Sequence, residues 1–171
     1  MPDDQFDSFV AENGGALLRC AYLLCRDRGR AEDLVQDSLV KAMRRWRDAD
    51  VPEHAEAYVR RIVVNEYLSW RRRRASTELI GLVDRDAGAA DGSDERADRD
   101  AMWQLLGTLA PRPRAVLVLR YYQQLPDREI AELLGCAEAT VRSLAARAFA
   151  TLRADHRLSE LVPGRAQPKE A

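Results

Sequence analysis

Apolar residues recur at spacings of three and four along almost the whole chain, and no segment of useful length alternates like a β-strand. Between residues 30 and 47, for example, the apolar side chains fall on one helical face and the charged ones on the other. The same spacing predicts helices over residues 7–25, 30–47, 53–74, 99–109, 112–123, 127–134 and 137–153. The chain is therefore expected to adopt an all-α fold.

The charged residues are distributed unevenly along the chain. Residues 1–74 carry 14 Lys and Arg against 13 Asp and Glu, residues 75–100 carry 3 against 8, and residues 101–171 carry 10 against 7. Helical periodicity fades over the acidic stretch, which has the composition of a flexible linker. We expect two small helical domains, 1–74 and 99–158, joined by a flexible acidic linker over 75–98. The tail, residues 159–171, is expected to be disordered.

Several functional classes are disfavoured by what the sequence lacks. No apolar run approaches the roughly 18 residues that a membrane helix needs, and the first residues do not resemble a signal peptide. We therefore expect a cytoplasmic protein that does not insert into a membrane. Cys20, Cys25 and Cys136 are expected to be reduced and in or near the core. His54 and His156 show no ligand spacing, so we expect neither a metal nor a cofactor.

The strongest local motif is a helix-turn-helix over residues 127–147, inside the C-terminal domain. Gly135 can adopt the positive φ of a tight turn, and the small Ala131 lets the second helix cross close to the first. An ordinary helical hairpin with solvated arginines is the alternative. The side chains expected to face DNA in the major groove are Glu138, Thr140, Arg142, Ser143, Ala146 and Arg147.

Two motifs resemble parts of bacterial RNA polymerase sigma factors. Residues 127–153 resemble the promoter-reading region, and Ala-Glu-Asp-Leu-Val-Gln-Asp at 31–37 resembles the helix that grips core polymerase. The resemblance covers about residues 6–155 and is closest to the extracytoplasmic-function group, which retains only regions two and four. We therefore expect no autoinhibitory domain before residue 6 and no ligand-binding domain after residue 157.

The resemblance implies a protein that binds core RNA polymerase and directs promoter-specific transcription initiation, without catalysing a reaction itself. It assigns polymerase binding to Asp33, Gln36 and Asp37, whose acidic and amide side chains suit the basic clamp helices of the large subunit. Judged by charge pattern alone, the same residues could form a plain solvated face. The resemblance also implies control by an anti-sigma factor.

The predicted third helix resembles the element that recognises and melts the minus-ten sequence. We expect its polar side to carry the residues that bind this DNA, which are Arg60, Arg61, Asn65, Arg71, Arg72, Arg73 and Arg74. The loop at 48–52 takes the place where the family captures a flipped base, but its acidic composition leaves the base-reading residue unassigned. Tyr58, Tyr67 and Trp70 could stack on DNA, although aromatic residues at helical spacing more often belong to the core.

One residue departs from the family pattern. Ala146 lies on the outer face of the expected recognition helix, where the family commonly has a basic or bulky residue. Either a different promoter preference or a weaker minus-thirty-five contact is therefore expected. Two rival functions remain at this point: a stand-alone helix-turn-helix regulator, and a sigma-like decoy that binds polymerase or an anti-sigma factor without initiating. A transcript made by core enzyme with this chain would exclude both.

Overall fold

The computed structural model describes residues 2–47, 54–78 and 104–155, and every regular element in these ranges is helical. The elements are α1 (Pro2–Cys25), α2 (Arg28–Arg47), α3 (Ala55–Glu78), α5 (Pro111–Leu117), the π-helical η1 (Val118–Tyr122), α6 (Asp127–Leu134) and α7 (Glu138–Ala154). Residues 104–108 are also helical. The predicted all-α fold is confirmed for these ranges. Helix α3 runs four residues into the stretch expected to be a linker, whereas the rest of that stretch, the 48–52 loop and the tail lie outside the described residues.

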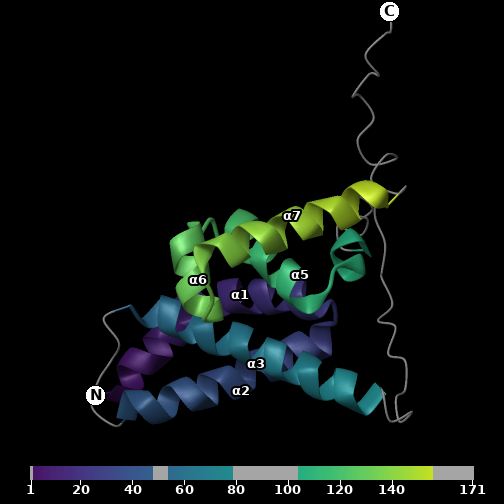
Figure 1. Ribbon diagram of the computed structural model, residues 1–171. Helices are drawn as coiled ribbons and strands as arrows, with labels where there is room; N and C mark the ends of the chain where they lie inside the picture. The colour runs from purple at the N-terminus through teal and green to yellow at the C-terminus, as the bar shows by residue number, and fades with distance from the viewer. Residues whose placement is uncertain (1, 48–53, 79–103, 156–171) are drawn as a thin grey trace, which may run out of the picture.

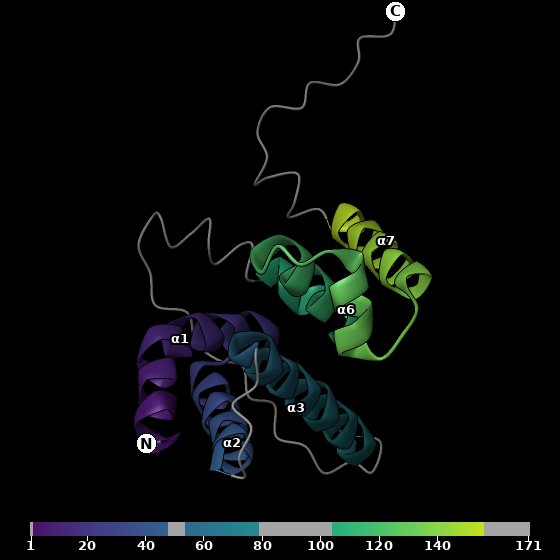
Figure 2. The same ribbon diagram turned by 90° about the vertical axis from the view of Figure 1, so that its left-hand side faces the viewer.

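The helices form two stacked units. We call α1–α3 the N-terminal unit and residues 104–155 the C-terminal unit. Helix α2 lies at the bottom of the molecule and α7 at the top in both views (Figures 1 and 2). Helices α1 and α3 pack against α5, and α1 also packs against η1. The two units therefore contact each other directly.

An aromatic cluster closes one end of the N-terminal unit. Phe6 and Phe9 of α1 each lie with their ring centroids 5.2 Å from that of Trp46 of α2. All three side chains are buried, as the periodicity predicted. Helix α1 begins earlier than expected and continues through Gly14 and Gly15 without a break. Its packing against α2 and α3 offsets the low helix propensity of the two glycines.

The C-terminal unit contains a departure from regular α-helix that the sequence did not reveal. Helix α5 continues directly into η1, where the N–H of Gln123 donates to the carbonyl of Val118 at 3.1 Å, five residues earlier. The wider turn leaves Leu119 fully buried, while Tyr121 packs edge-on against Phe149 of α7 with ring centroids 5.6 Å apart. The predicted single helix over 112–123 is thus correct in extent but not in its last turn.

The three cysteines are free, as expected. Burial raises the pKa of Cys20 to about 11 and that of Cys25 to about 12, so both stay protonated thiols at neutral pH.

Within residues 2–47, 54–78 and 104–155, no group of acidic, cysteine and histidine residues is arranged to hold a metal ion. No helix in the same ranges is long and apolar enough to cross a membrane.

Candidate nucleic-acid interface

The turn between α6 and α7 has the geometry that the sequence predicted. Gly135 has a φ of 61°, which only glycine adopts without strain. The N–H of Cys136 donates to the carbonyl of Ala131 at 3.0 Å, and the N–H of Gly135 donates to that of Glu132 at 3.4 Å. These bonds satisfy the last carbonyls of α6 and reverse the chain. Ala131 is buried, which permits the close crossing of α7.

Helix α7 presents its outer side to solvent. Helical spacing predicts an inward stripe of Val141, Ala145, Ala148 and Leu152. The first three are buried and Leu152 is half-buried, while Leu144 is buried outside the stripe. The six side chains expected to face DNA, Glu138, Thr140, Arg142, Ser143, Ala146 and Arg147, are all exposed. Nη1 of Arg142 and Oε2 of Glu138 lie 3.6 Å apart at the surface. An exposed pair of this kind contributes little stability, so the arginine is available to a partner.

Two arginines fix α6 relative to the preceding helix. Arg120 Nε donates to Oδ1 of Asp127 in the first turn of α6 at 2.8 Å, and this hydrogen bond raises the pKa of Arg120. Arg112 Nη2 donates to the carbonyl of Leu134 at 3.3 Å, at the other end of α6. With α6 held at both ends, the position of α7 follows from the Gly135 turn.

The arginines of α3 are less uniform than the sequence suggested. Arg60 was expected on the polar side of the helix, and this is wrong: only 9% of it is exposed. Its guanidinium forms an ion pair with Glu56, one turn earlier. Arg60 follows the fully buried Val59, so its side chain begins inside the helix packing, and the long aliphatic stem reaches outward to the carboxylate.

Three arginines lie around the ring of Trp70. The guanidinium carbons of Arg30, Arg71 and Arg74 lie 5.2, 5.6 and 5.8 Å from the ring centroid. At these distances the cations are attracted by the π-system. Arg71 and Arg74 are half-buried, so these two arginines of the 71–74 run already contact a ring within the protein.

The remaining expected minus-ten residues, Arg61, Asn65, Arg72 and Arg73, are exposed. Arg72 Nη2 donates to Oγ of Ser69 at 3.1 Å, which orients its guanidinium along the helix surface. Tyr67 is fully buried, and Tyr58 and Trp70 are half-buried. The expectation that these aromatic residues more often belong to the core is therefore confirmed for Tyr67.

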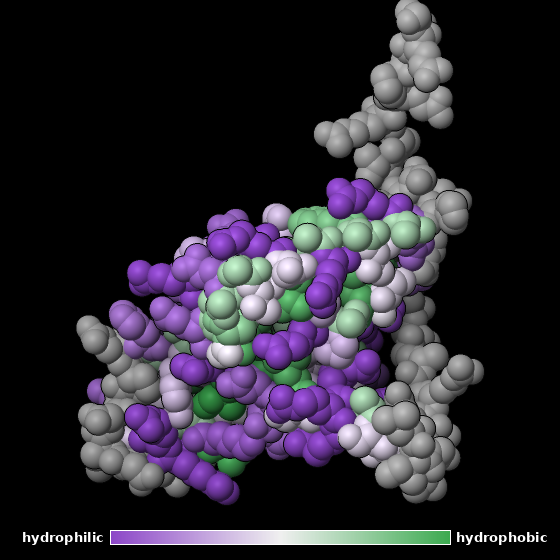
Figure 3. All heavy atoms as spheres, viewed as in Figure 1, coloured by the Kyte–Doolittle hydropathy of each residue, from purple (hydrophilic) through white to green (hydrophobic). Residues whose placement is uncertain are grey.

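Helix α2 exposes Asp33, Gln36 and Asp37 together. The next residue, Ser38, is buried, and its hydroxyl donates to the carbonyl of Leu34 at 2.7 Å, so it is not part of this surface. The lower part of the molecule, formed by α2 and α3, is covered mainly by hydrophilic side chains (Figure 3). Lys41 of α2 pairs with Glu66 of α3 at 2.6 Å. This ion pair adds to the apolar packing between α2 and α3, while the three expected polymerase-binding side chains face solvent.

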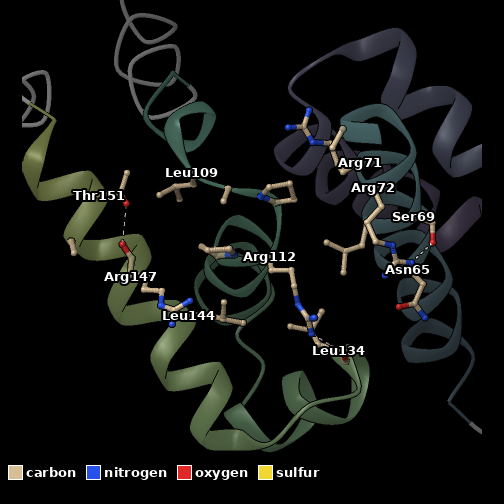
Figure 4. A pocket seen from close by; sticks show the side chains of 16 residues that line it. Asn65, Ser69, Arg71, Arg72, Leu109, Arg112, Leu134, Leu144, Arg147 and Thr151 are labelled. Atoms are coloured by element: carbon tan, nitrogen blue, oxygen red, sulfur yellow. Dashed lines mark hydrogen bonds between the residues drawn. The ribbon is translucent and has the colours of Figure 1, made fainter. Parts of the chain in front are cut away.

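A cleft of about 970 Å³ lies between α3 and α7. Asn65, Ser69 and Arg72 of α3 line one side, and Leu144, Arg147 and Thr151 of α7 line the other (Figure 4). Four arginines line the cleft, Arg71, Arg72, Arg112 and Arg147, and no carboxylate of the described ranges does. The structure therefore brings expected minus-ten and minus-thirty-five residues to one place, which the sequence did not anticipate.

Arg112 and Arg114 were not singled out from the sequence. Arg112 is exposed and belongs to the cleft, whereas Arg114 is 5% exposed and reaches across to α1. The sequence signal that could have pointed to them is their alternation with Pro111 and Pro113. It indicates a helix start, but it does not reveal that one arginine turns inward.

Comparison with known families assigns both units. The family model described as Sigma-70 region 2 matches residues 9–77, and that described as Sigma-70, region 4 matches residues 99–152. An RNA polymerase sigma-E factor from Streptomyces avermitilis is 37% identical over 149 residues, covering 87% of this chain and 83% of the relative. The ECF RNA polymerase sigma factor SigL from Mycobacterium tuberculosis is 29% identical over 150 residues, covering 83% of each chain.

Solved structures share the arrangement. The sigma factor RpoE in complex with the anti-sigma factor NepR, from Bartonella quintana, matches with a TM-score of 0.74 at 24% identity. That match covers 91% of this chain and 97% of the other, and it shows a common fold. CnrH in complex with the cytosolic domain of CnrY matches with a TM-score of 0.62 at 27% identity, over 89% of this chain and 87% of the other.

Proposed function

Because the chain belongs to the extracytoplasmic-function group of RNA polymerase sigma factors, we propose that it uses three separate surfaces to direct transcription initiation. Helix α2 binds core RNA polymerase, the exposed side of α3 meets the minus-ten DNA, and the outer face of α7 meets the minus-thirty-five DNA. The chain thereby brings the enzyme to one class of promoters and catalyses no reaction itself. It acts in the cytoplasm, where the polymerase is.

The observation that carries the proposal is the exposed outer face of α7 behind a glycine turn. Arg142 lies near the start of the helix and Arg147 near its middle; both are exposed, and Val141 and Ala145 beside them are buried. Arginine at such a position can donate two hydrogen bonds to a guanine edge in the major groove. Ala146 between them carries no polar group, so we assign the base contact to Arg142 and phosphate contacts to Ser143 and Arg147. Thr140 and Glu138 border this contact at the start of the helix.

On α3 the proposal favours the exposed residues over the buried ones. Arg61, Asn65, Arg72 and Arg73 are free to contact the minus-ten DNA, and each neutralised phosphate releases counterions. Arg71 and Arg74 can join them only by leaving the ring of Trp70. We therefore propose that these two hold the helix end in shape and contribute less to DNA affinity.

For polymerase binding we propose Asp33, Gln36 and Asp37. Their two carboxylates and one amide form an exposed acceptor surface on a helix whose opposite face is buried in the N-terminal unit. Such a surface complements a basic helical partner, for which electrostatic complementarity sets both on-rate and specificity.

An anti-sigma factor is the further partner we propose. Support comes from the two solved structures named above, since the first contains the anti-sigma factor NepR and the second the cytosolic domain of CnrY.

Run-off transcription tests the proposed function. Purified chain added to core RNA polymerase should give a transcript of defined length from its own promoter, while core enzyme alone gives none. A chain that binds the promoter fragment but gives no transcript with core would be a stand-alone helix-turn-helix regulator. A chain that binds core and gives no transcript from any template of a promoter library would be a decoy, and either result would contradict the proposal.

A further inference from the structure

The two units meet along the C-terminal half of α1. Arg19 Nε donates to the hydroxyl of Tyr122 in η1 at 3.0 Å. Gly107 lies so close to the guanidinium of Arg26 that a Cβ at this position would collide with it. Two side chains of the N-terminal unit, Arg19 and Arg26, thus reach the C-terminal unit.

Arg114 lies at the centre of this contact. Its Nη1 donates to the carbonyl of Leu24 at 2.8 Å, and Nη2 donates to the carbonyls of Leu109 at 2.9 Å and Gly107 at 3.2 Å. Leu24 belongs to the last turn of α1, where carbonyls have no partner within the helix. One buried guanidinium therefore ties the end of α1 to the turn that precedes α5.

The same contact carries an electrostatic cost. Burial lowers the pKa of Arg114 and outweighs the opposing effect of Tyr67, and the nearby charges of Arg71 and Arg26 lower it further. No carboxylate of the described ranges hydrogen-bonds to its guanidinium, which donates only to neutral carbonyls. A buried cation that is hydrogen-bonded but not neutralised is held less firmly than one that is paired with a carboxylate. Opening the contact returns Arg114 to water and separates it from its positive neighbours.

The contact also has a geometric consequence for promoter recognition. By their names the two promoter elements lie about 25 base pairs apart, which at about 3.4 Å per base pair is roughly 85 Å of DNA. Arg72 and Arg147 line a single cleft of about 970 Å³. Side chains that line one small cleft cannot contact two DNA sites so far apart at the same time.

We propose that Arg114 is a latch: it holds the C-terminal unit closed on α1, and the chain reads both promoter elements only after this contact has opened. The statement about promoter elements rests on the proposed function, whereas the closure and its dependence on Arg114 do not. Arg114 is thus a positioning residue that acts on the relative placement of α3 and α7 and does not itself contact DNA.

The test is a distance measurement between the units of the free chain. Spin labels are attached at Ser76→Cys and Arg153→Cys, two exposed positions that flank the cleft on α3 and α7. Cys25→Ala and Cys136→Ala in the background prevent unwanted labelling, and Cys20 is buried. Pulsed electron paramagnetic resonance should give one short, narrow distance distribution. Arg114→Gln should raise the fraction of long distances about tenfold.

Arg112→Gln is the matched control. Arg112 lies on the same helix and is exposed, and its hydrogen bond stays within the C-terminal unit, so the distance distribution should not change. If circular dichroism shows that Arg114→Gln unfolds, Arg19→Ala takes its place. It removes an exposed bond between the units and should raise the fraction of long distances about two- to threefold.

Four results would overturn the proposal. The first is a broad distribution in the parent chain. The second is a narrow distribution that persists in folded Arg114→Gln. The third applies if Arg114→Gln unfolds, and it is a narrow distribution that persists in Arg19→Ala. Adding core RNA polymerase to the labelled parent chain should lengthen the distance, and a short distance in that complex would also contradict the latch. Since the first measurements contain neither polymerase nor DNA, a failure of the proposed function would leave their outcome unaffected.

Discussion

The arginines of α3 and those of α7 differ in what surrounds them. On α3, Arg60 is buried against Glu56, and Arg71 and Arg74 lie against the ring of Trp70. On α7, Arg142 and Arg147 are exposed, and Arg142 forms a loose surface pair with Glu138. The same residue type therefore serves the fold at three positions of α3 and remains available on the exposed side of α7.

This difference teaches that charge alone does not identify a DNA-binding surface. A buried or stacked guanidinium must give up an existing contact before it can meet a phosphate, whereas an exposed one gives up only water and side-chain freedom. On this basis we expect the N-terminal unit to bind DNA through a few exposed side chains and polymerase through α2. We expect the C-terminal unit to supply base-specific contacts.

The largest expected effect separates the two units by partner. Asp33→Lys with Asp37→Lys reverses the charge of the α2 surface and should weaken association with core RNA polymerase by about a hundredfold or more, since like charges then face each other across the interface. Duplex binding through α7 should not change. Co-elution with core enzyme at moderate salt measures the effect. Asp7→Lys with Glu12→Lys, two exposed acidic residues of α1, is the matched control, and equal losses in both double variants would refute the assignment to α2.

The next effect concerns base reading by α7. Arg142→Ala should cost about 1–3 kcal/mol on the preferred minus-thirty-five duplex and relax specificity there. Arg128→Ala, an exposed arginine on α6, serves as the control and should change affinity far less. Fluorescence titrations against matched and scrambled duplexes measure both. Should Arg142→Ala lose the same affinity on both duplexes, its contact would be to phosphate.

A third prediction concerns the buried arginine of α3. Arg60→Ala removes a guanidinium that pairs with Glu56, and we expect the free energy of unfolding to fall by about 1–2 kcal/mol. The neighbouring exposed Arg61→Ala should leave stability within about 0.5 kcal/mol. Urea denaturation followed by circular dichroism measures the difference. Equal stability of the two variants would mean that Arg60 does not belong to the packing of α3.

The smallest effect is a pH dependence where the two units meet. The pKa of Cys25 is about 12 in the folded chain because of burial, against 9.0 for an ordinary thiol. Below pH 9.0 the Cys25 thiol is neutral in both the folded and the unfolded chain, so its full contribution to stability is present. As pH rises from there toward 12, only the unfolded chain ionises, so stability is lost. Between pH 8 and pH 10 the parent should lose about 1 kcal/mol more than Cys25→Ala does. Parallel losses in the two proteins would show that Cys25 ionises normally in the folded chain.

Local features of this fold could be predicted from the sequence, because they depend on neighbours in the chain. The glycine turn at Gly135 follows from backbone freedom at one residue, and its φ of 61° is confirmed. The inward stripe of α7 follows from helical spacing, and Val141, Ala145 and Ala148 are buried as predicted. The exposure of Asp33, Gln36 and Asp37 follows from the same reasoning on α2.

The features that were missed depend on partners far away in the sequence. Arg114 is buried because a carbonyl 90 residues earlier accepts its hydrogen bond, and no local pattern shows such a partner. The predicted exposure of Arg60 is wrong because packing against neighbouring helices sets the width of a buried face, and on α3 that face includes Arg60 beside Val64 and Tyr67. The π-helical turn arises where η1 packs against α1, which is again a tertiary effect. The roles of the DNA-facing and polymerase-facing residues remain predictions.

Run-off transcription on two templates tests most directly whether α7 reads bases while α3 contacts the DNA backbone. The templates differ only in that one has a scrambled minus-thirty-five element, and core enzyme is combined with the parent chain, with Arg142→Ala, or with Arg72→Ala and Arg73→Ala together. We expect the parent to favour the intact template and Arg142→Ala to lose most of that preference. The double variant should give less transcript from both templates but keep the parent's ratio. A preference that survives in Arg142→Ala and disappears in the double variant would contradict this division of roles between α7 and α3.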